Sequence, residues 1–241
     1  MNKSIAGSGE ILAGEYESIR ISGSGRLFGL VRCESFSTSG SSTGESIECG
    51  NAFKVSGEST FTKDVSAGHV SIAGSFTCGG DLLARERVSV SGSAKCMRNI
   101  KCGSMSVAGE LIANADIEAE TVKVTGEVKC AGLLNAESIT IKGNGSKIGS
   151  VGGSSIVICR GSVSKNLVKV PVISTIVKSV SSKVCVMHDI EGDEIMLENV
   201  EVPRVSGRIV TIGDDCRIDL VQYSQEINIS PKAKVAKTEK I

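Results

Sequence analysis

The stretch Ser18-Ile19-Arg20-Ile21-Ser22-Gly23-Ser24-Gly25 decides the fold, because its first six residues recur as a pattern along the chain. Each copy alternates apolar and polar residues and then reaches a glycine, as in HVSIAG at 69–74 and TVKVTG at 121–126. Eight glycines close such copies at successive spacings of 17 or 18 residues: Gly23, Gly40, Gly57, Gly74, Gly92, Gly109, Gly126 and Gly143. A period fixed in this range predicts a repeat architecture.

The residues around each glycine form three further series. Four and two places before it stand Ile19/Ile21, Phe36/Thr38, Phe53/Val55, Val70/Ile72, Val88/Val90, Met105/Val107, Val122/Val124 and Ile139/Ile141, an alternation that predicts a strand with one buried face. Four places after it stand Leu27, Gly44, Phe61, Cys78, Cys96, Ala113 and Cys130. A second narrow position holds Cys33, Ala67, Ala84, Cys102, Ala119 and Ala136.

A repeat of 17 residues is too short for two helices and too long for one hairpin, but it fits a coil of about three short strands. Stacked coils of this kind make an all-β parallel β-helix. We therefore expect about twelve coils, with Val55, Ile72, Val90, Val107 and Val124 in one buried column. The glycines are expected to take a positive φ at the bend after each strand.

The regularity of the repeat divides the chain into four parts. The β-helix repeats occupy 1–160, an irregular or short-helix insertion 161–186, further coils 187–230 and a basic tail 231–241. Within the insertion, the residues from Pro171 to Val180 have helical spacing, whereas their β-branched content equally favours a strand.

Composition narrows the functional classes. Lys+Arg and Asp+Glu both total 27, so the chain has no excess of positive charge to hold a nucleic acid backbone. The N-terminus lacks the apolar stretch of a signal peptide, and no run of about 18 apolar residues occurs, which favours a cytoplasmic protein. Nine cysteines without a C-x-x-C motif, together with two histidines, argue against metal and disulfide sites and favour small core fillers.

Candidate catalytic residues are few, and we expect no catalytic, cofactor-binding or metal site. His69 has no catalytic partner in the sequence and is interpreted as a surface residue at a corner. Asp64, Asp81 and Asp116 fall at or near one corner of successive coils and predict a solvated acidic ridge. The cluster from His188 to Glu194 lacks the spacing of a calcium loop and is interpreted as a charged turn.

The order of the motifs resembles the bactofilin family of bacterial cytoskeletal proteins. The residues that carry the resemblance are Gly14–Gly25, Ile190–Asn199, Val210–Gly213 and Tyr223–Ser224. The resemblance implies a right-handed β-helix that polymerises end to end in the cytoplasm without nucleotide, as a scaffold for envelope or motility proteins. This chain is longer than short bactofilins and lacks the membrane-targeting N-terminal tail that many carry, so membrane contact stays open.

A solenoid end exposes unpaired backbone groups, which makes the ends the candidate self-association sites. At the N-terminal end these residues are Ile5, Ile11, Leu12 and Tyr16, and at the C-terminal end Ile227 and Ile229. Because lysines near the C-terminus blunt a strand edge, we expect the N-terminal end to associate more readily, giving at least head-to-head dimers, and filaments only if the C-terminal end also opens. Ile11→Lys is expected to weaken association without unfolding. The alternative function is a monomeric β-helix that binds a protein or polysaccharide partner.

Overall fold

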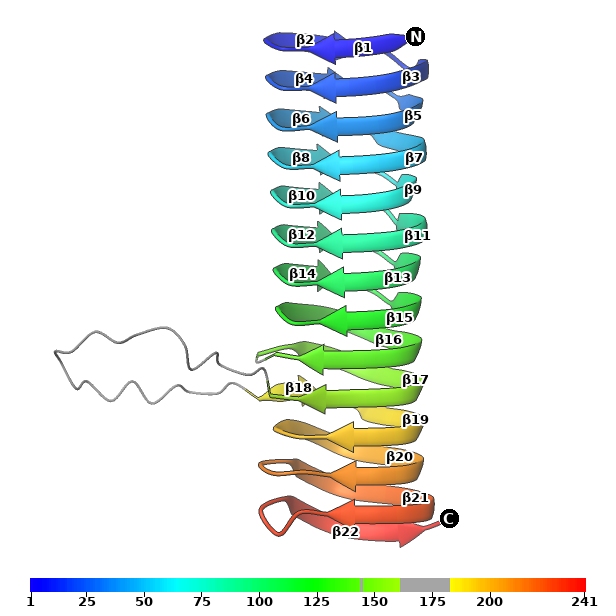
Figure 1. Ribbon diagram of the computed structural model, residues 1–241, viewed down its shortest axis with the longest axis vertical. Coiled ribbons are helices and arrows are strands. Elements are labelled where there is room, and N and C mark those ends of the chain that lie inside the picture. Colours follow the sequence, from blue (N-terminus) through cyan, green and yellow to red (C-terminus); the bar gives the residue numbers. More distant parts are fainter. Residues whose placement is uncertain (144, 161–182) are drawn as a thin grey trace, which may run out of the picture.

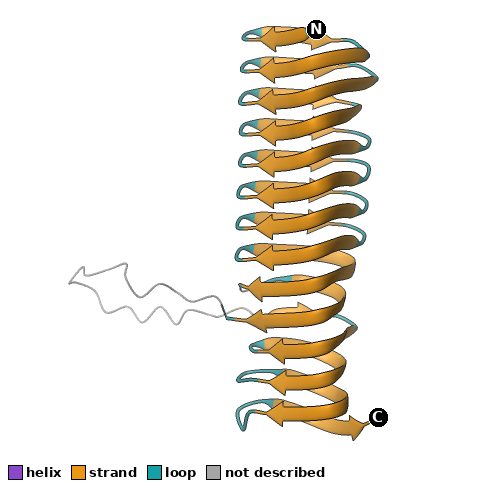
Figure 2. Cartoon of the chain, turned by 45° about the vertical axis from the view of Figure 1, so that its right-hand side comes forward, coloured by secondary structure: helices purple, strands orange, loops and turns teal. Residues whose placement is uncertain are grey.

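The computed structural model describes residues 1–143, 145–160 and 183–241, and every regular element in these ranges is a β-strand. Figure 2 shows the strands stacked in a single column, with turns only at the corners. The strands are β1 (Asn2–Ile5), β2 (Ser8–Ile11), β3 (Gly14–Ile21), β4 (Ser24–Leu27), β5 (Leu30–Thr38), β6 (Ser41–Gly44), β7 (Ser46–Val55), β8 (Glu58–Phe61), β9 (Val65–Ile72), β10 (Ser75–Cys78), β11 (Leu82–Val90), β12 (Ser93–Cys96), β13 (Ile100–Val107), β14 (Glu110–Ala113), β15 (Ile117–Val124), β16 (Glu127–Lys142), β17 (Lys147–Cys159), β18 (Val184–Val186), β19 (Asp189–Leu197), β20 (Val200–Ile212), β21 (Arg217–Ile229) and β22 (Lys234–Lys240).

The strands wind into a right-handed parallel β-solenoid of about 13 turns (Figure 1). One interior column runs through every turn in strict register: Ile5, Ile21, Thr38, Val55, Ile72, Val90, Val107, Val124, Ile141, Ile158, Leu197, Ile212 and Ile229. This confirms the predicted fold class and the predicted column from Val55 to Val124.

In most of the N-terminal turns a short strand is followed by a long strand that bends. In β7, for example, the register against β9 shifts between Glu48 and Ala52, so the two halves of the strand face different sides of the core. The short strand and the two halves of the long strand thus form three sides of such a turn, and each side directs alternate residues inward. This arrangement explains why the sequence shows three apolar series for each repeat.

The repeated glycines are needed for close packing, and the expectation of positive φ was wrong. Among the described glycines, positive φ occurs at Gly14, Gly29 and Gly145. A Cβ on Gly57 would instead overlap the carbonyl oxygen of Gly40 in the turn before, and the same holds along the series. The stacked turns approach too closely here for any side chain, so the constraint is distance between backbones.

The first turns of the core hold a cluster of phenylalanines. Phe36 and Phe53 stack with centroids 5.0 Å apart, and Phe61 meets Phe53 edge-on at 5.7 Å. Gly44 provides the room for Phe61, because a Cβ there would lie 2.6 Å from the phenyl ring. Large and small residues therefore alternate along one column to fill a core of constant width.

Two predicted boundaries differ from the structure. β18 already belongs to the solenoid, so the second set of coils begins before residue 187. Residues 234–240 form β22, which pairs in parallel with β21, so they add a strand instead of a free basic tail. The helix considered from Pro171 to Val180 lies outside the described residues.

Candidate functional site: the two ends and the polar ladders of the solenoid

The N-terminal end is closed more tightly than the sequence predicts. Ile5 and Ile11 are only 7% and 1% exposed, although the described residues place no further strand above them. Gly9 explains this closure, since the Ile5 side chain lies 3.2 Å from where its Cβ would be and fills the interior of the first turn. Leu12 is exposed at a corner, and Tyr16 is half-buried and donates to the Leu12 carbonyl at 3.0 Å.

The C-terminal end leaves more apolar surface uncovered. Ile229 is 36% exposed, and Ile227 and Val235 are half-buried beneath the last complete turn. The described residues pair β22 with β21 alone, so its outer edge is free. The candidate residues of both ends therefore lie where predicted, but Ile11→Lys would put an ammonium group into the core and unfold the first turn.

The two ends have matching registers, which sequence reasoning missed. The interior columns that begin at Ile5, Ile11 and Tyr16 end at Ile229, Val235 and Lys240. The spacing along the chain is six and then five residues in both sets. The last turn therefore presents the same set of columns to a second copy as each turn presents to its neighbour inside the rod.

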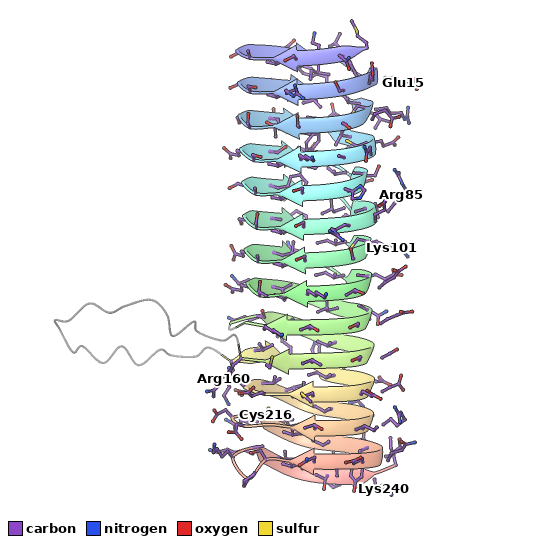
Figure 3. All side chains as sticks on the ribbon, viewed as in Figure 1. Glu15, Arg85, Lys101, Arg160, Cys216 and Lys240 are labelled. Atoms are coloured by element: carbon purple, nitrogen blue, oxygen red, sulfur yellow. The ribbon has the colours of Figure 1, made fainter. Side chains whose placement is uncertain are left out.

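The ends also carry opposite charge. Residues 2–17 contain three glutamates and one lysine, whereas residues 226–240 contain four lysines and two glutamates. Figure 3 places Glu15 on the turns near the N-terminus and Lys240 on the last turn. Glu10 and Lys234 occupy equivalent, outward-facing positions beside Ile11 and Val235.

The acidic ridge predicted at one corner is a ladder of hydrogen bonds between turns. Asp64 Oδ1 accepts from the Asp81 backbone N–H at 2.8 Å, and Asp81 Oδ1 accepts from the Asn99 N–H at 3.0 Å. Asn99 and Asp116 continue the series to the Leu133 N–H. These side chains bind backbone N–H groups of successive turns and so hold the corner together.

The two histidines are both exposed. His69 is exposed and its Nε2 lies 3.0 Å from the Glu86 carboxylate. Near His188, Asp189 pairs with Arg204 at 2.7 Å and Glu194 with Arg208 at 2.9 Å. The Arg204 and Ser150 hydrogen bonds hold the pKa of Asp189 below its ordinary value.

The cysteines are mostly small core residues, as predicted. Seven are buried, and Cys159 and Cys185 are half-buried. Burial raises the pKa of Cys102 to about 12 and that of Cys130 to about 11. Within 1–143, 145–160 and 183–241, no group of three or more His, Cys, Asp or Glu side chains could hold a metal ion.

A shallow groove of about 840 Å³ runs over one corner of the C-terminal turns. Gly153, Gly192 and Gly207 stack along it, and a Cβ on Gly192 would overlap the Gly153 carbonyl. Its rim includes Glu137, Asp189 and further carboxylates. The glycine stack explains the hollow, because three successive turns present bare backbone there.

Comparisons with known proteins place few constraints on function. No family model matches the chain, and no solved structure matches it. A stretch of 67 residues is 36% identical to the uncharacterized protein YhbE of Bacillus subtilis (strain 168), and covers 28% of each chain. The chain thus matches well under a third of the length of this relative. The described residues include no helix that could cross a membrane.

Proposed function

We propose that this protein is a non-enzymatic scaffold of the bactofilin type that polymerises end to end, without nucleotide, in the cytoplasm. The observation that carries the proposal is the match between the two ends. The columns at Ile229, Val235 and Lys240 can continue into those at Ile5, Ile11 and Tyr16 of a second copy without a change of register.

The geometry favours head-to-tail contacts. All strand pairs of the solenoid are parallel, and only a head-to-tail junction preserves that direction across the contact. Charge acts in the same sense, since Glu10 of one copy would face Lys234 of the next, whereas a head-to-head junction would bring two acidic ends together. A heterologous contact without closure generates an open filament.

The edge of each end supplies the driving force. Unpaired N–H and C=O groups of β22 would gain the same ladder that joins every other pair of turns, and the exposed part of Ile229 would be covered. Filaments of this kind suit a scaffold for envelope or motility proteins, which is the role that the family resemblance implies.

A charge swap tests the junction. We expect sedimentation velocity of the wild type to show species that grow with concentration, and electron microscopy to show rods longer than one molecule. Glu10→Lys and Lys234→Glu should each weaken assembly, and the double variant should restore it, because the pair across the junction regains opposite charges.

Ile229→Lys provides a second variant that should weaken assembly. This side chain is already partly exposed, so its replacement should leave the fold intact. Circular dichroism checks that each variant keeps the wild-type strand content. A wild type that stays monomeric at high micromolar concentration would contradict the proposal. It would favour the alternative function, a monomeric β-helix that binds a protein or polysaccharide.

One observation bears on that alternative. The groove beside Gly192 has room for an extended chain, but Tyr223 is the sole tyrosine in the C-terminal turns and does not line it. Polysaccharide sites usually offer aromatic platforms, so a protein segment fits this groove better than a sugar chain does.

A further inference from the structure

Two cysteines of neighbouring turns meet inside the rod near its N-terminal end. Cys33 in β5 and Cys49 in β7 are register partners, and their Sγ atoms lie 3.5 Å apart. Both are free thiols. Partners in adjacent parallel strands stand about 4.8 Å apart at Cα, which lies within the range that disulfides span.

The pair lies beside a groove on the surface of the rod. Cys33 and Cys49 are 6% and 2% exposed, and both line a groove of about 420 Å³ on the surface. Gly50 also lines it and contributes no side chain, while the Arg85 guanidinium donates to the Gly50 carbonyl across two turns. The register of β5 against β7 shifts just after Cys33, so the backbone here already departs from a regular ladder.

The chain contains its own comparison pair. Cys78 and Cys96 are register partners in β10 and β12, but they are 0% and 1% exposed. Both thiols donate to the Gly80 carbonyl, at 3.5 and 3.3 Å. Stacking of two cysteines is thus common to both pairs, whereas Cys33 and Cys49 also line a surface groove and are slightly more exposed.

The sulfurs of Cys33 and Cys49 are chemically unequal. The hydrogen bond that Cys33 shares with Cys49 lowers the pKa of the Cys33 thiol, and the same bond together with burial raises the pKa of Cys49. Cys33 is therefore the sulfur that becomes a thiolate first. It is also the more exposed of the two, which suits the role of attacking group.

We propose that Cys33 and Cys49 form a thiol–disulfide exchange site whose oxidant is a low-molecular-weight disulfide. Cys33 attacks one sulfur of the reagent, so the reagent disulfide breaks, a mixed disulfide forms and one small thiolate leaves. Cys49 then loses its proton and attacks the Cys33 sulfur, releasing the second small thiolate. Two protein thiols are oxidised to one disulfide and one small disulfide is reduced to two thiols.

The lining of the groove indicates which reagents fit. Three carboxylates, those of Glu15, Glu34 and Glu48, stand against the guanidinium groups of Arg32 and Arg85. Arg32 is already paired with Glu48 at 2.8 Å. The local field therefore favours a cationic disulfide over an anionic one.

The test exposes the full-length reduced protein to cystamine without oxygen and follows it by intact mass and peptide mapping. We expect the mass to fall by two hydrogen atoms, with a peptide linking Cys33 to Cys49. Cystamine should react faster than oxidised glutathione. The pair should react at least about tenfold faster than Cys78 and Cys96 under native conditions.

Single variants separate the steps. Cys49→Ala should trap a cysteamine adduct on Cys33, whereas Cys33→Ala should leave Cys49 unmodified. Alanine fills the same column at Ala67 and Ala84, so both variants should fold. Cys78→Ala should still form the Cys33–Cys49 link. Either the absence of a linked peptide in the wild type, or equal reactivity of Cys49 in Cys33→Ala, would overturn the proposal.

Discussion

The N-terminal and C-terminal turns close the same corner in two different ways. From Gly23 to Gly126 the corner is a stack of backbone, in which the Ser41 N–H donates to the Gly23 carbonyl at 2.9 Å and the pattern repeats turn after turn. In the C-terminal turns Asn199 and Asp215 stand near this corner with φ of 58° and 60°. There Lys232 pairs with Asp214 at 2.7 Å, and Arg160 pairs with Asp215.

The difference shows what each kind of corner tolerates. A backbone stack needs no charge and is independent of pH and salt, but it excludes every side chain. A corner held by ion pairs accepts varied sequences, and its strength depends on protonation and ionic strength. The strict period of the N-terminal turns and the irregular sequence of the C-terminal turns follow from this contrast.

The largest expected effect comes from placing a side chain in the backbone stack. Gly57→Ala should lower the free energy of unfolding by more than about 3 kcal/mol, because the new Cβ overlaps the Gly40 carbonyl and the turns must separate. Urea denaturation followed by circular dichroism measures this loss.

Gly7→Ala is the matched control, since a Cβ there meets no atom within 4 Å. It should be nearly neutral. Similar losses at Gly7 and Gly57 would show that glycine matters here for backbone flexibility instead of for close approach.

An intermediate effect is expected at the ladder of polar side chains. Asp81→Ala leaves the Asn99 N–H without its acceptor and should cost about 1–2 kcal/mol in the free energy of unfolding. Asp81→Asn keeps an acceptor oxygen at the same place and should cost less. If both variants behave alike in urea denaturation, the stabilisation comes from the charge and not from the hydrogen bond.

The smallest effect should come from the ion-pair corner, and it should depend on pH. Hydrogen bonds from Lys232 and Ser230 lower the pKa of Asp214. A depressed carboxyl pKa stabilises the fold above the unfolded value of about 4, and this contribution is lost as the pH falls through the lower, folded value.

Asp214→Asn should therefore lower the urea midpoint slightly near about pH 7, and the difference from wild type should shrink towards about pH 2. Asp219→Asn, on an exposed position of β21, serves as the control and should show no such trend. A difference that stays constant over this range would mean that the aspartate acts without its charge.

These contrasts explain how much the sequence could predict. The fold followed from the glycine period, because close backbone stacking forces the same residue at every turn. Positive φ was wrongly expected, since a repeated glycine alone does not distinguish a left-handed bend from a close contact. Asp64, Asp81 and Asp116 were correctly placed on one corner, but their hydrogen bonds depend on register to within one residue.

The end match and the cysteine pair were harder to foresee for a related reason. Cys33 and Cys49 are 16 residues apart and Cys78 and Cys96 are 18 apart, so a single fixed spacing in the sequence does not identify both pairs as register partners. The correspondence of Ile5 with Ile229 requires counting through the region of 161–182, where the sequence period is lost. Once the turns are aligned in space, the match between the two ends and the pairing of the cysteines both follow from the strand register.

The unbroken column from Ile5 to Ile229 has a genetic consequence. Every turn begins and ends at equivalent points, so duplication of the coding segment for one turn would lengthen the rod by about 4.8 Å without altering either terminus. The inserted copy would find a correct neighbour on both sides, because Val90 and Val107 already contact equivalents of themselves. The length of such a rod changes in steps of one whole turn, and selection could adjust it by one turn at a time.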